Sequence, residues 1–414
     1  MVRLKFETIK ALLTSQYWLI LTLSGAFFAF FALNRSGIVV FIKLSLVFLI
    51  LNVLFGEYKL KTIPISYWIT SAICAYLLLA SVLLYPQHSH FRWMGNLVRM
   101  LVVVFAIHCL SQKKIAGRVP EFFSAILSLT VCYQFAARYF FHMPHGTFTN
   151  IHYLATFTVL ALPIIYYFFW VTTSWPKFLF ALIAIMDANL LLQTGSRPAF
   201  LGIIAGTFFV FIFLVKGRYK WFGMIFICFI LAALYLTDYA NFASRIQDLI
   251  VNLAEEERIQ LWTKAFNKIK ENSLLTWIFG RGIGWSPITY TEGPNFSILL
   301  VSPHSFFLEI VYLNGLIGFF LIFGGLAVLF KSIINTARQN QNRKNRLLLT
   351  CLIIVFLTWF IHCGLTFPFY TKYSQYPLAF IFGSMLAFID KISRDMAIKP
   401  KYLENISESL NMDS

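Results

Sequence analysis

Arg197, Arg258 and His304 are the three side chains whose positions in the sequence suggest chemistry. Arg197 stands in TGSRPAFLG between two long apolar runs, Arg258 begins an amphipathic stretch, and His304 opens another apolar run. A guanidinium binds phosphate bidentately at low hydration cost, and a neutral imidazole can accept a proton. Together, these residue types suit a phosphate-binding cationic site beside a candidate base.

His304 lies in SPHSFFLEI, where Ser302 suits the N-cap of a helix and Pro303 suits its first position. This pattern predicts His304 in the first helical turn, where the helix dipole keeps the imidazole neutral and favours a bound anion. Glu309 lies more than one turn further along, inside the apolar run, where an ionisable side chain is costly and usually functional or paired. The alternative for His304 is an ordinary histidine at a membrane surface.

Arg258 lies in a segment that predicts an amphipathic helix from Glu255 to about Glu271. Because Arg258 precedes Trp262 by one turn, it shares the apolar face, whereas the lysines of the segment point elsewhere. Such a helix lies on a membrane surface and directs the arginine inward; the alternative is an arginine that extends only to lipid headgroups. The predicted apolar positions are Ile259, Trp262, Ala265, Phe266 and Ile269.

Arg197 is expected over a helix N-terminus, with Ser196 as the N-cap or, alternatively, with Arg197 itself capping before Pro198. Arg138 is a further cation of the candidate binding site. The other cations expected at the same membrane edge are Arg35, Arg92 and Lys372, of which Arg35 and Arg92 are better explained as anchors to anionic membrane lipid.

The stretch WIFGRGIGW contains three alternating glycines, Gly280, Gly282 and Gly284. Glycine backbone can approach a phosphate or a sugar closely, which makes Gly280 and Gly282 candidate substrate-binding residues. An equally good interpretation is a plain turn that returns the chain toward the membrane. A nucleotide-binding fingerprint is excluded because no βαβ unit surrounds the glycines.

The elements that must position these residues are membrane helices. Of the 414 residues, 59% are hydrophobic and 12% are charged, whereas soluble domains have about 25% charged residues. We predict an all-α polytopic membrane protein with about 12 transmembrane helices and one long periplasmic segment that contains the amphipathic helix. The predicted spans are approximately 16–33, 37–55, 66–85, 93–110, 121–141, 152–172, 177–193, 199–215, 219–236, 306–330, 347–365 and 374–390.

The net charge of +17 resides mostly in short loops that fall on one face, which predicts that both termini are cytoplasmic. The N-terminal apolar run is expected to be a retained first span rather than a cleaved signal peptide. The chain then divides into transmembrane helices 1–9 (1–236), a periplasmic segment (237–305), helices 10–12 (306–390) and a cytoplasmic tail (391–414). The outer face holds most of the histidines, so chemistry is expected there: His88, His90, His142, His145, His152, His304 and His362, with His108 at the cytoplasmic end.

Several other classes of function are not indicated. Nucleic-acid binding is excluded because the positive-inside rule accounts for the charge. The pair His88 and His90 with His142 and His145 lacks ordered metal-ligand spacing, so neither a metal nor another cofactor is predicted. The six cysteines lie within or at the ends of apolar runs without CxxC spacing and are expected to be packing residues.

The order of these features resembles the O-antigen ligase family, which includes lipopolysaccharide ligases, O-antigen polymerases and bacterial protein O-oligosaccharyltransferases. The shared pattern is Thr-x-Ser-Arg at the outer end of one span, a long outer segment with a helical arginine before a Gly-x-Gly turn, and Pro-His at the start of the next span. The resemblance is strongest from about Leu191 to Phe319.

This resemblance implies metal-independent, nucleotide-independent glycosyl transfer at the periplasmic face of the bacterial inner membrane. The donor would be a glycan on undecaprenyl diphosphate, and the acceptor a sugar hydroxyl of lipid A–core, with inversion of the anomeric carbon. Arg197 and Arg258 match the family's arginines that hold the diphosphate, and His304 matches its proposed general base. Asn150 and His152 lie in a comparably placed polar stretch.

Three alternatives stay open. A polymerase uses the same chemistry with a second glycan chain as acceptor and often has two large outer loops, whereas one is seen here. A protein O-oligosaccharyltransferase usually has an extra C-terminal outer region. A flippase or transporter, which belongs to a different class, needs ionisable residues near mid-membrane and usually internal repeats, and Lys43, Arg99 and Asp187 are too scattered for that.

Overall fold

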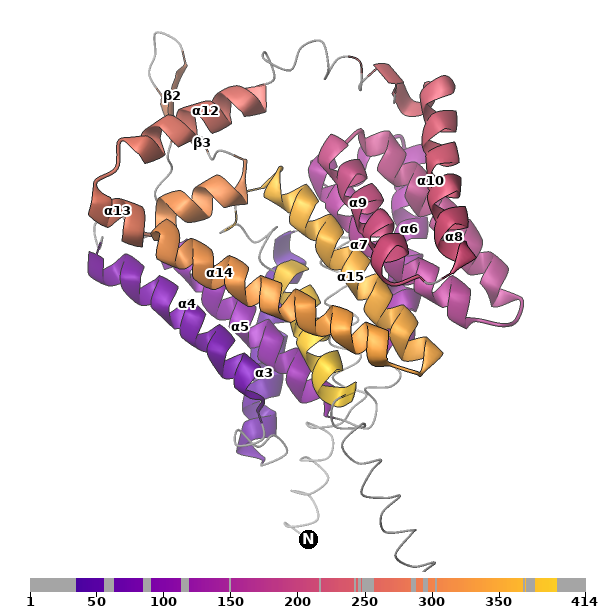
Figure 1. The fold of residues 1–414 in the computed structure, drawn as a ribbon, viewed down its shortest axis with the longest axis horizontal. Helices are drawn as coiled ribbons and strands as arrows, with labels where there is room; N and C mark the ends of the chain where they lie inside the picture. Colours follow the sequence, from indigo (N-terminus) through magenta and orange to yellow (C-terminus); the bar gives the residue numbers. More distant parts are fainter. Residues whose placement is uncertain are drawn as a thin grey trace, which may run out of the picture.

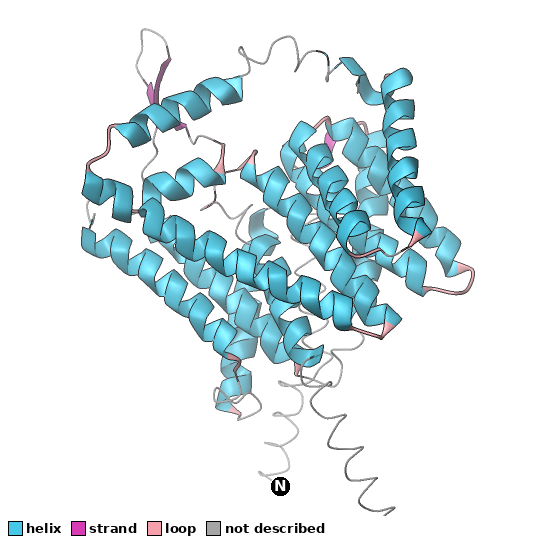
Figure 2. Cartoon of the chain, in the orientation of Figure 1, coloured by secondary structure: helices cyan, strands magenta, loops and turns pink. Residues whose placement is uncertain are grey.

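The protein is built almost entirely from α-helices (Figure 1 and Figure 2). The computed structural model describes residues 35–55, 63–84, 91–112, 119–148, 150–215, 217–241, 243–244, 247, 257–283, 288–292, 297–301, 304–367, 369 and 377–392. The first predicted span, 16–33, lies outside the described residues, as do His88, His90, Gly284, Ser302, Pro303 and Lys372.

The long helices follow the predicted spans closely. Seven described helices are long and apolar enough to cross a membrane, and α9, with 17 residues, is a shorter apolar helix. A polytopic helical membrane protein is therefore confirmed, while the predicted number of about 12 spans stays a prediction. The long helices are α3 (Arg35–Leu54), α4 (Ile65–Leu84), α5 (Phe91–Ser111), α6 (Val119–Tyr139), α7 (Ile151–Val171), α8 (Pro176–Thr194), α9 (Arg197–Phe213), α10 (Arg218–Leu236), α14 (Phe306–Gln339), α15 (Arg343–Gly364) and a helical stretch over 377–392.

Helix α15 is a central element on which α7, α9 and α14 pack. Glycines allow α9 to approach it closely: a Cβ atom on Gly202 would lie 2.8 Å from the Thr358 carbonyl oxygen, and one on Gly206 would lie 3.2 Å from the Ile354 carbonyl oxygen. Moving from Gly202 to Gly206 along α9 thus corresponds to moving back from Thr358 to Ile354 along α15. The two helices are antiparallel, and the first residue of α9 lies at the level of the last turn of α15.

Helix α14 is broken at Gly315, whose φ of 62° and ψ of −169° are not helical. The break frees carbonyl groups that a continuous helix would use, a feature tolerated at membrane depth where the backbone is buried in protein. The Tyr312 carbonyl accepts from the N–H of Arg281 (3.0 Å), and the Leu313 carbonyl accepts from the N–H of Gly282 (2.9 Å). The glycine-containing turn therefore caps the first half of α14.

The segment between α10 and α14 contains α12 (Glu257–Lys270), the short α13 (Leu274–Phe279) and an antiparallel hairpin of β2 (Ile288–Glu292) with β3 (Ser297–Val301). In Figure 1, α12 and the hairpin lie across one end of the helix bundle, beside the first half of α14. The predicted amphipathic helix is confirmed, whereas the hairpin was not expected from the sequence. Leu261 and Ala265 of α12 pack against Leu308 of α14, which fixes this arrangement.

Helix α14 extends nine residues beyond the predicted end of its span, from 330 to Gln339, and includes Lys331 and Arg338. Hydrophobicity predicts only the part of a helix that lies in hydrocarbon. The backbone hydrogen bonds of the helix can continue beyond that part, where charged side chains reach water. In the last turn, the Arg338 guanidinium donates to the Phe213 carbonyl at the end of α9 (3.4 Å).

Candidate functional site

A short segment that follows α15 organises the candidate site; we call it the strap and define it as Leu365, Thr366, Phe367 and Phe369. The strap lies at the bundle end that carries α12. Its backbone forms hydrogen bonds with three predicted site residues. Arg258 donates to the Leu365 carbonyl (3.2 Å) and His304 Nδ1 lies 3.0 Å from the Thr366 carbonyl oxygen. The N–H of Phe369 donates to the carboxylate of Glu309, which is buried in the first turn of α14.

The position of His304 differs from the prediction. Helix α14 begins at Phe306 with Ser305 as its N-cap, so His304 precedes the helix instead of lying in its first turn. Its φ of 49° is in the left-handed region, which no helical residue adopts, and this conformation turns the chain before the helix starts. The prediction from Ser-Pro was therefore wrong about where the helix begins. The His304 side chain is exposed.

The contact with Thr366 fixes the tautomer of His304. A backbone carbonyl can only accept a hydrogen bond, so Nδ1 must carry the proton in the 3.0 Å contact. In the neutral imidazole the lone pair then belongs to Nε2. His304 is thus arranged so that Nε2 is the nitrogen that can accept a proton from a substrate.

Arg258 lies on the inward face of α12, as predicted. Leu261, Ala265 and Ile269 are buried on this face, and the half-buried Arg258 precedes the first of them by one turn. The predicted face is wrong in one member, because Phe266 is 46% exposed. The apolar contact of α12 with α14 holds the guanidinium against the strap.

Arg197 is the first residue of α9, and Ser196 is its N-cap. The Ser196 carbonyl accepts from the N–H groups of Ala199 (3.0 Å) and Phe200 (3.1 Å). Ser196, and not Arg197, is therefore the N-cap. Gly195, in the left-handed region with φ 61°, ends α8 and makes the sharp return. Because α9 and α15 are antiparallel, Arg197 lies at the same end of the bundle as the strap.

Arg138, in the last turn of α6, is engaged with backbone. Its guanidinium donates to the carbonyl of Pro144 and to that of Gln193 (3.4 Å), two residues before Gly195. Arg138 therefore connects the loop after α6 to the start of the turn that carries Arg197.

Gly280 and Gly282 have φ values of 82° and 86°, a region that favours glycine. The N–H of Gly280 donates to the Thr276 carbonyl (2.8 Å), and that of Gly282 donates to Leu313. Both amides are thus used within the protein. This geometry favours the plain-turn interpretation over backbone amides that face a phosphate.

Residues 179–323 match the family model described as O-antigen ligase. This match supports membership of the O-antigen ligase family. The matched range contains Arg197, Arg258, His304 and Glu309, and ends before the strap. The O-antigen ligase family implies a glycosyltransferase-like activity of the ligase or polymerase type, and with the apolar helices it indicates a membrane protein. None of the curated proteins compared with the chain matches it.

Outside the range matched by the O-antigen ligase model, a second group of polar residues lies behind the strap. Thr156 Oγ1 of α7 lies 3.0 Å from His362 Nε2 of α15, and both side chains are buried. His152 lies close enough to Arg258 and His304 to interact with both electrostatically. We predicted His152 and His362 on the outer face. The contact between Thr156 and His362 was not predicted, because 206 positions separate these two residues.

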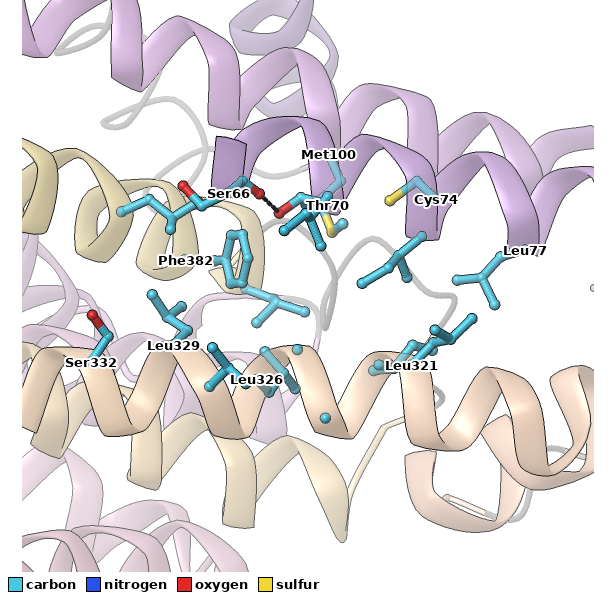
Figure 3. Close-up of a pocket in the computed structure, with 18 of the residues that line it drawn as sticks. Ser66, Thr70, Cys74, Leu77, Met100, Leu321, Leu326, Leu329, Ser332 and Phe382 are labelled. Atoms are coloured by element: carbon cyan, nitrogen blue, oxygen red, sulfur yellow. Dashed lines mark hydrogen bonds between the residues drawn. The ribbon is translucent and has the colours of Figure 1, made fainter. Parts of the chain in front are cut away.

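An apolar cavity of about 690 Å³ extends from the strap toward the opposite end of the bundle. It lies between α4, α14 and the stretch 377–392, and Figure 3 shows side chains of α4 facing those of α14 across it. Phe369 of the strap lines the cavity, and so does Asp390, which lies 3.5 Å from His108. The cavity thus joins the candidate site to the end of the bundle where His108 was predicted.

Proposed function

We propose that the chain is an O-antigen ligase, which transfers a glycan from undecaprenyl diphosphate to a sugar hydroxyl of lipid A–core at the periplasmic face of the inner membrane. The family match supports transfer of the ligase or polymerase type. One observation carries the proposal: adjacent carbonyls, those of Leu365 and Thr366, hold Arg258 and His304 next to each other. A phosphate-binding cation and a base with a defined tautomer are the two groups that this reaction requires.

His304 acts as the general base. Its Nε2 takes the proton of the acceptor hydroxyl while the hydroxyl oxygen forms a bond to the anomeric carbon of the donor glycan. The bond from that carbon to the diphosphate oxygen breaks, and the electron pair leaves with the diphosphate. Direct displacement inverts the anomeric carbon.

Arg258 and Arg197 bind the diphosphate and stabilise the charge that develops as it leaves. Two guanidinium groups can each form two hydrogen bonds to phosphate oxygens. The N-termini of α9 and α14 lie at this end of the bundle, and their dipoles favour the same anion. The site therefore supplies positive charge without a metal ion.

Glu309, Arg138, Gly280 and Gly282 support the site through backbone contacts. Glu309 holds the strap at Phe369, and Arg138 holds the turn before Arg197. Gly280 ends α13, and Gly282 joins the following turn to α14. We assign them a role in shaping the binding site in preference to direct contact with the glycan.

The apolar cavity is the proposed place of the donor's polyprenyl chain. Its lining is mostly aliphatic, with Leu77, Leu326 and Leu329 among its residues, and it reaches the strap at Phe369. A hydrocarbon chain in this cavity leaves the attached diphosphate at the bundle end that carries the arginines.

Gel analysis of lipopolysaccharide from cells lacking this protein tests the proposal, with wild type or His304→Ala supplied in trans. We expect bare core in the deleted cells, accumulation of long glycan on undecaprenyl diphosphate, and rescue by wild type alone. Core carrying a single repeat unit would identify a polymerase instead. An unchanged ladder would contradict both reactions.

A further inference from the structure

His362 is fully buried in the last turn of α15, and its hydrogen bond determines its tautomer. The hydroxyl of Thr156 donates to the His152 carbonyl one turn earlier in α7 (2.9 Å). Since a hydroxyl has a single proton, the 3.0 Å contact with His362 Nε2 then requires Nε2–H to be the donor. A buried threonine thus joins α7 to α15 directly behind the strap.

The aromatic ring of Phe367 is enclosed by the same two helices. The His362 ring meets it edge-on with 5.8 Å between ring centres, and the His152 ring meets it edge-on at 6.4 Å. Tyr153 stacks on Phe367 at 5.7 Å. Edge-on and offset stacked contacts are the favourable geometries for such rings, so Phe367 is fixed in place.

The strap leaves α15 immediately after His362. The N–H of Leu365 donates to the Ile361 carbonyl (3.1 Å), and the N–H of Phe367 donates to the Cys363 carbonyl (2.9 Å). These bonds tie the strap to the turn that contains His362. The Leu365 and Thr366 carbonyls, which hold Arg258 and His304, therefore lie between two fixed points: the last turn of α15 and the enclosed ring of Phe367.

We propose that His362 and Thr156 are positioning residues for the transfer reaction, because they hold the strap whose carbonyls align Arg258 and His304. This inference rests on the proposed function. Both residues are buried, so they act through the strap and not by touching substrate. A catalytic group displaced by about 1 Å can lose about 100-fold in rate, which sets the scale of the expected effect.

Two pairs of variants separate alignment from simple packing. Thr156→Val keeps the shape of the side chain and removes the hydroxyl, whereas Thr156→Ser keeps the hydroxyl. His362→Leu removes the donor, whereas His362→Gln keeps an N–H near the position of Nε2. Thr158→Val is the matched control, because Thr158 is buried in the same helix and its hydroxyl bonds to the Ala155 carbonyl of that helix.

Initial rates are measured with the purified full-length variants. The probes are undecaprenyl-diphosphate-linked glycan and bare-core lipopolysaccharide, both extracted from cells lacking the protein. We expect Thr156→Val and His362→Leu to lower kcat by about 10- to 100-fold with little change in KM. Thr156→Ser and His362→Gln should restore most of the rate, and Thr158→Val should behave as wild type.

The outcomes distinguish this inference from the proposed function. Wild-type kcat in Thr156→Val and His362→Leu, with His304→Ala inactive, would overturn the inference and leave the ligase proposal standing. Absence of transfer by the wild-type protein would overturn the proposed function itself, whereas activity in both His304→Ala and Arg258→Ala would overturn the roles proposed for these two residues. If His362→Leu fails to fold, the threonine pair decides: equal losses in Thr156→Ser and Thr156→Val would mean packing and would also overturn the inference.

Discussion

Arg258 and His304 donate hydrogen bonds to two consecutive backbone carbonyls, those of Leu365 and Thr366. Arg258 lies in the first turn of α12 and His304 directly before the N-cap of α14, and the strap brings the two side chains to one place. The relative position of the proposed phosphate ligand and the proposed base therefore depends on a third segment that follows α15.

Replacement of Arg258 by lysine should lower the transfer rate by about 100-fold or more, as expected for loss of a charge-stabilising donor. An ammonium group lacks the planar fork of donors with which a guanidinium can pair bidentately with a diphosphate while it bonds to the Leu365 carbonyl. The rate is measured with the extracted donor and acceptor. Lys264→Ala, on the exposed face of the same helix, is the control and should keep full activity. Equal rates in wild type and Arg258→Lys would exclude bidentate binding by this residue.

Gly280→Ala and Gly315→Ala should each destabilise the protein by about 2 kcal/mol or more, because both residues have positive φ and lie against backbone. A Cβ atom on Gly280 would clash with the Leu313 carbonyl, and one on Gly315 would clash with that of Ile278. Thermal unfolding in detergent gives the change in Tm. Gly324→Ala, in the same helix as Gly315 with open space around it, should not lower Tm. Unchanged Tm in all three variants would contradict the close packing of the turn on α14.

Glu309→Ala should lower stability by about 1 to 3 kcal/mol, because the buried N–H of Phe369 loses its acceptor. Glu309→Gln keeps a carbonyl oxygen at this position and should retain both stability and most of the transfer rate. Urea unfolding in detergent and the transfer assay measure the two quantities. Loss of activity in a stable Glu309→Gln protein would show that the carboxylate takes part in the reaction itself.

Gly324→Phe should raise KM for the lipid-linked donor about tenfold, equivalent to about 1.4 kcal/mol of binding free energy. Gly324 lines the apolar cavity and faces open space, so a phenyl ring can occupy volume that a polyprenyl chain would need. Gly324→Ala adds one methyl group and serves as the control. An unchanged KM for the donor in Gly324→Phe would place the hydrocarbon chain elsewhere.

Several features of the fold could be predicted because each depends on neighbours in the sequence. Apolar length predicted the long helices, and helical spacing predicted α12 with Arg258 on its inward face. Local signals also limited the N-cap of α9 to Ser196 or Arg197, and the structure has Ser196. Membrane thickness sets the length of an apolar helix, and hydrogen-bond periodicity sets which of its residues share a face. Both can be read from one short stretch of sequence.

The assembly of the site could not be predicted in the same way. Nothing local in Leu365 or Thr366 indicates that their carbonyls receive Arg258 and His304, because that contact depends on how α12, α14 and α15 pack. The Ser-Pro signal misled for a related reason: tertiary contact with the strap holds His304 in a left-handed conformation, which delays the start of α14.

The strap contributes main-chain atoms to Arg258 and His304, and this has a consequence for how the protein can change during evolution. Every amino acid supplies the same carbonyl oxygen, so residues other than proline that fit the space of Leu365 and of the buried Thr366 can replace them without removing either hydrogen bond. Divergent relatives can therefore keep this geometry with different side chains at these two positions, so a comparison of sequences would overlook them.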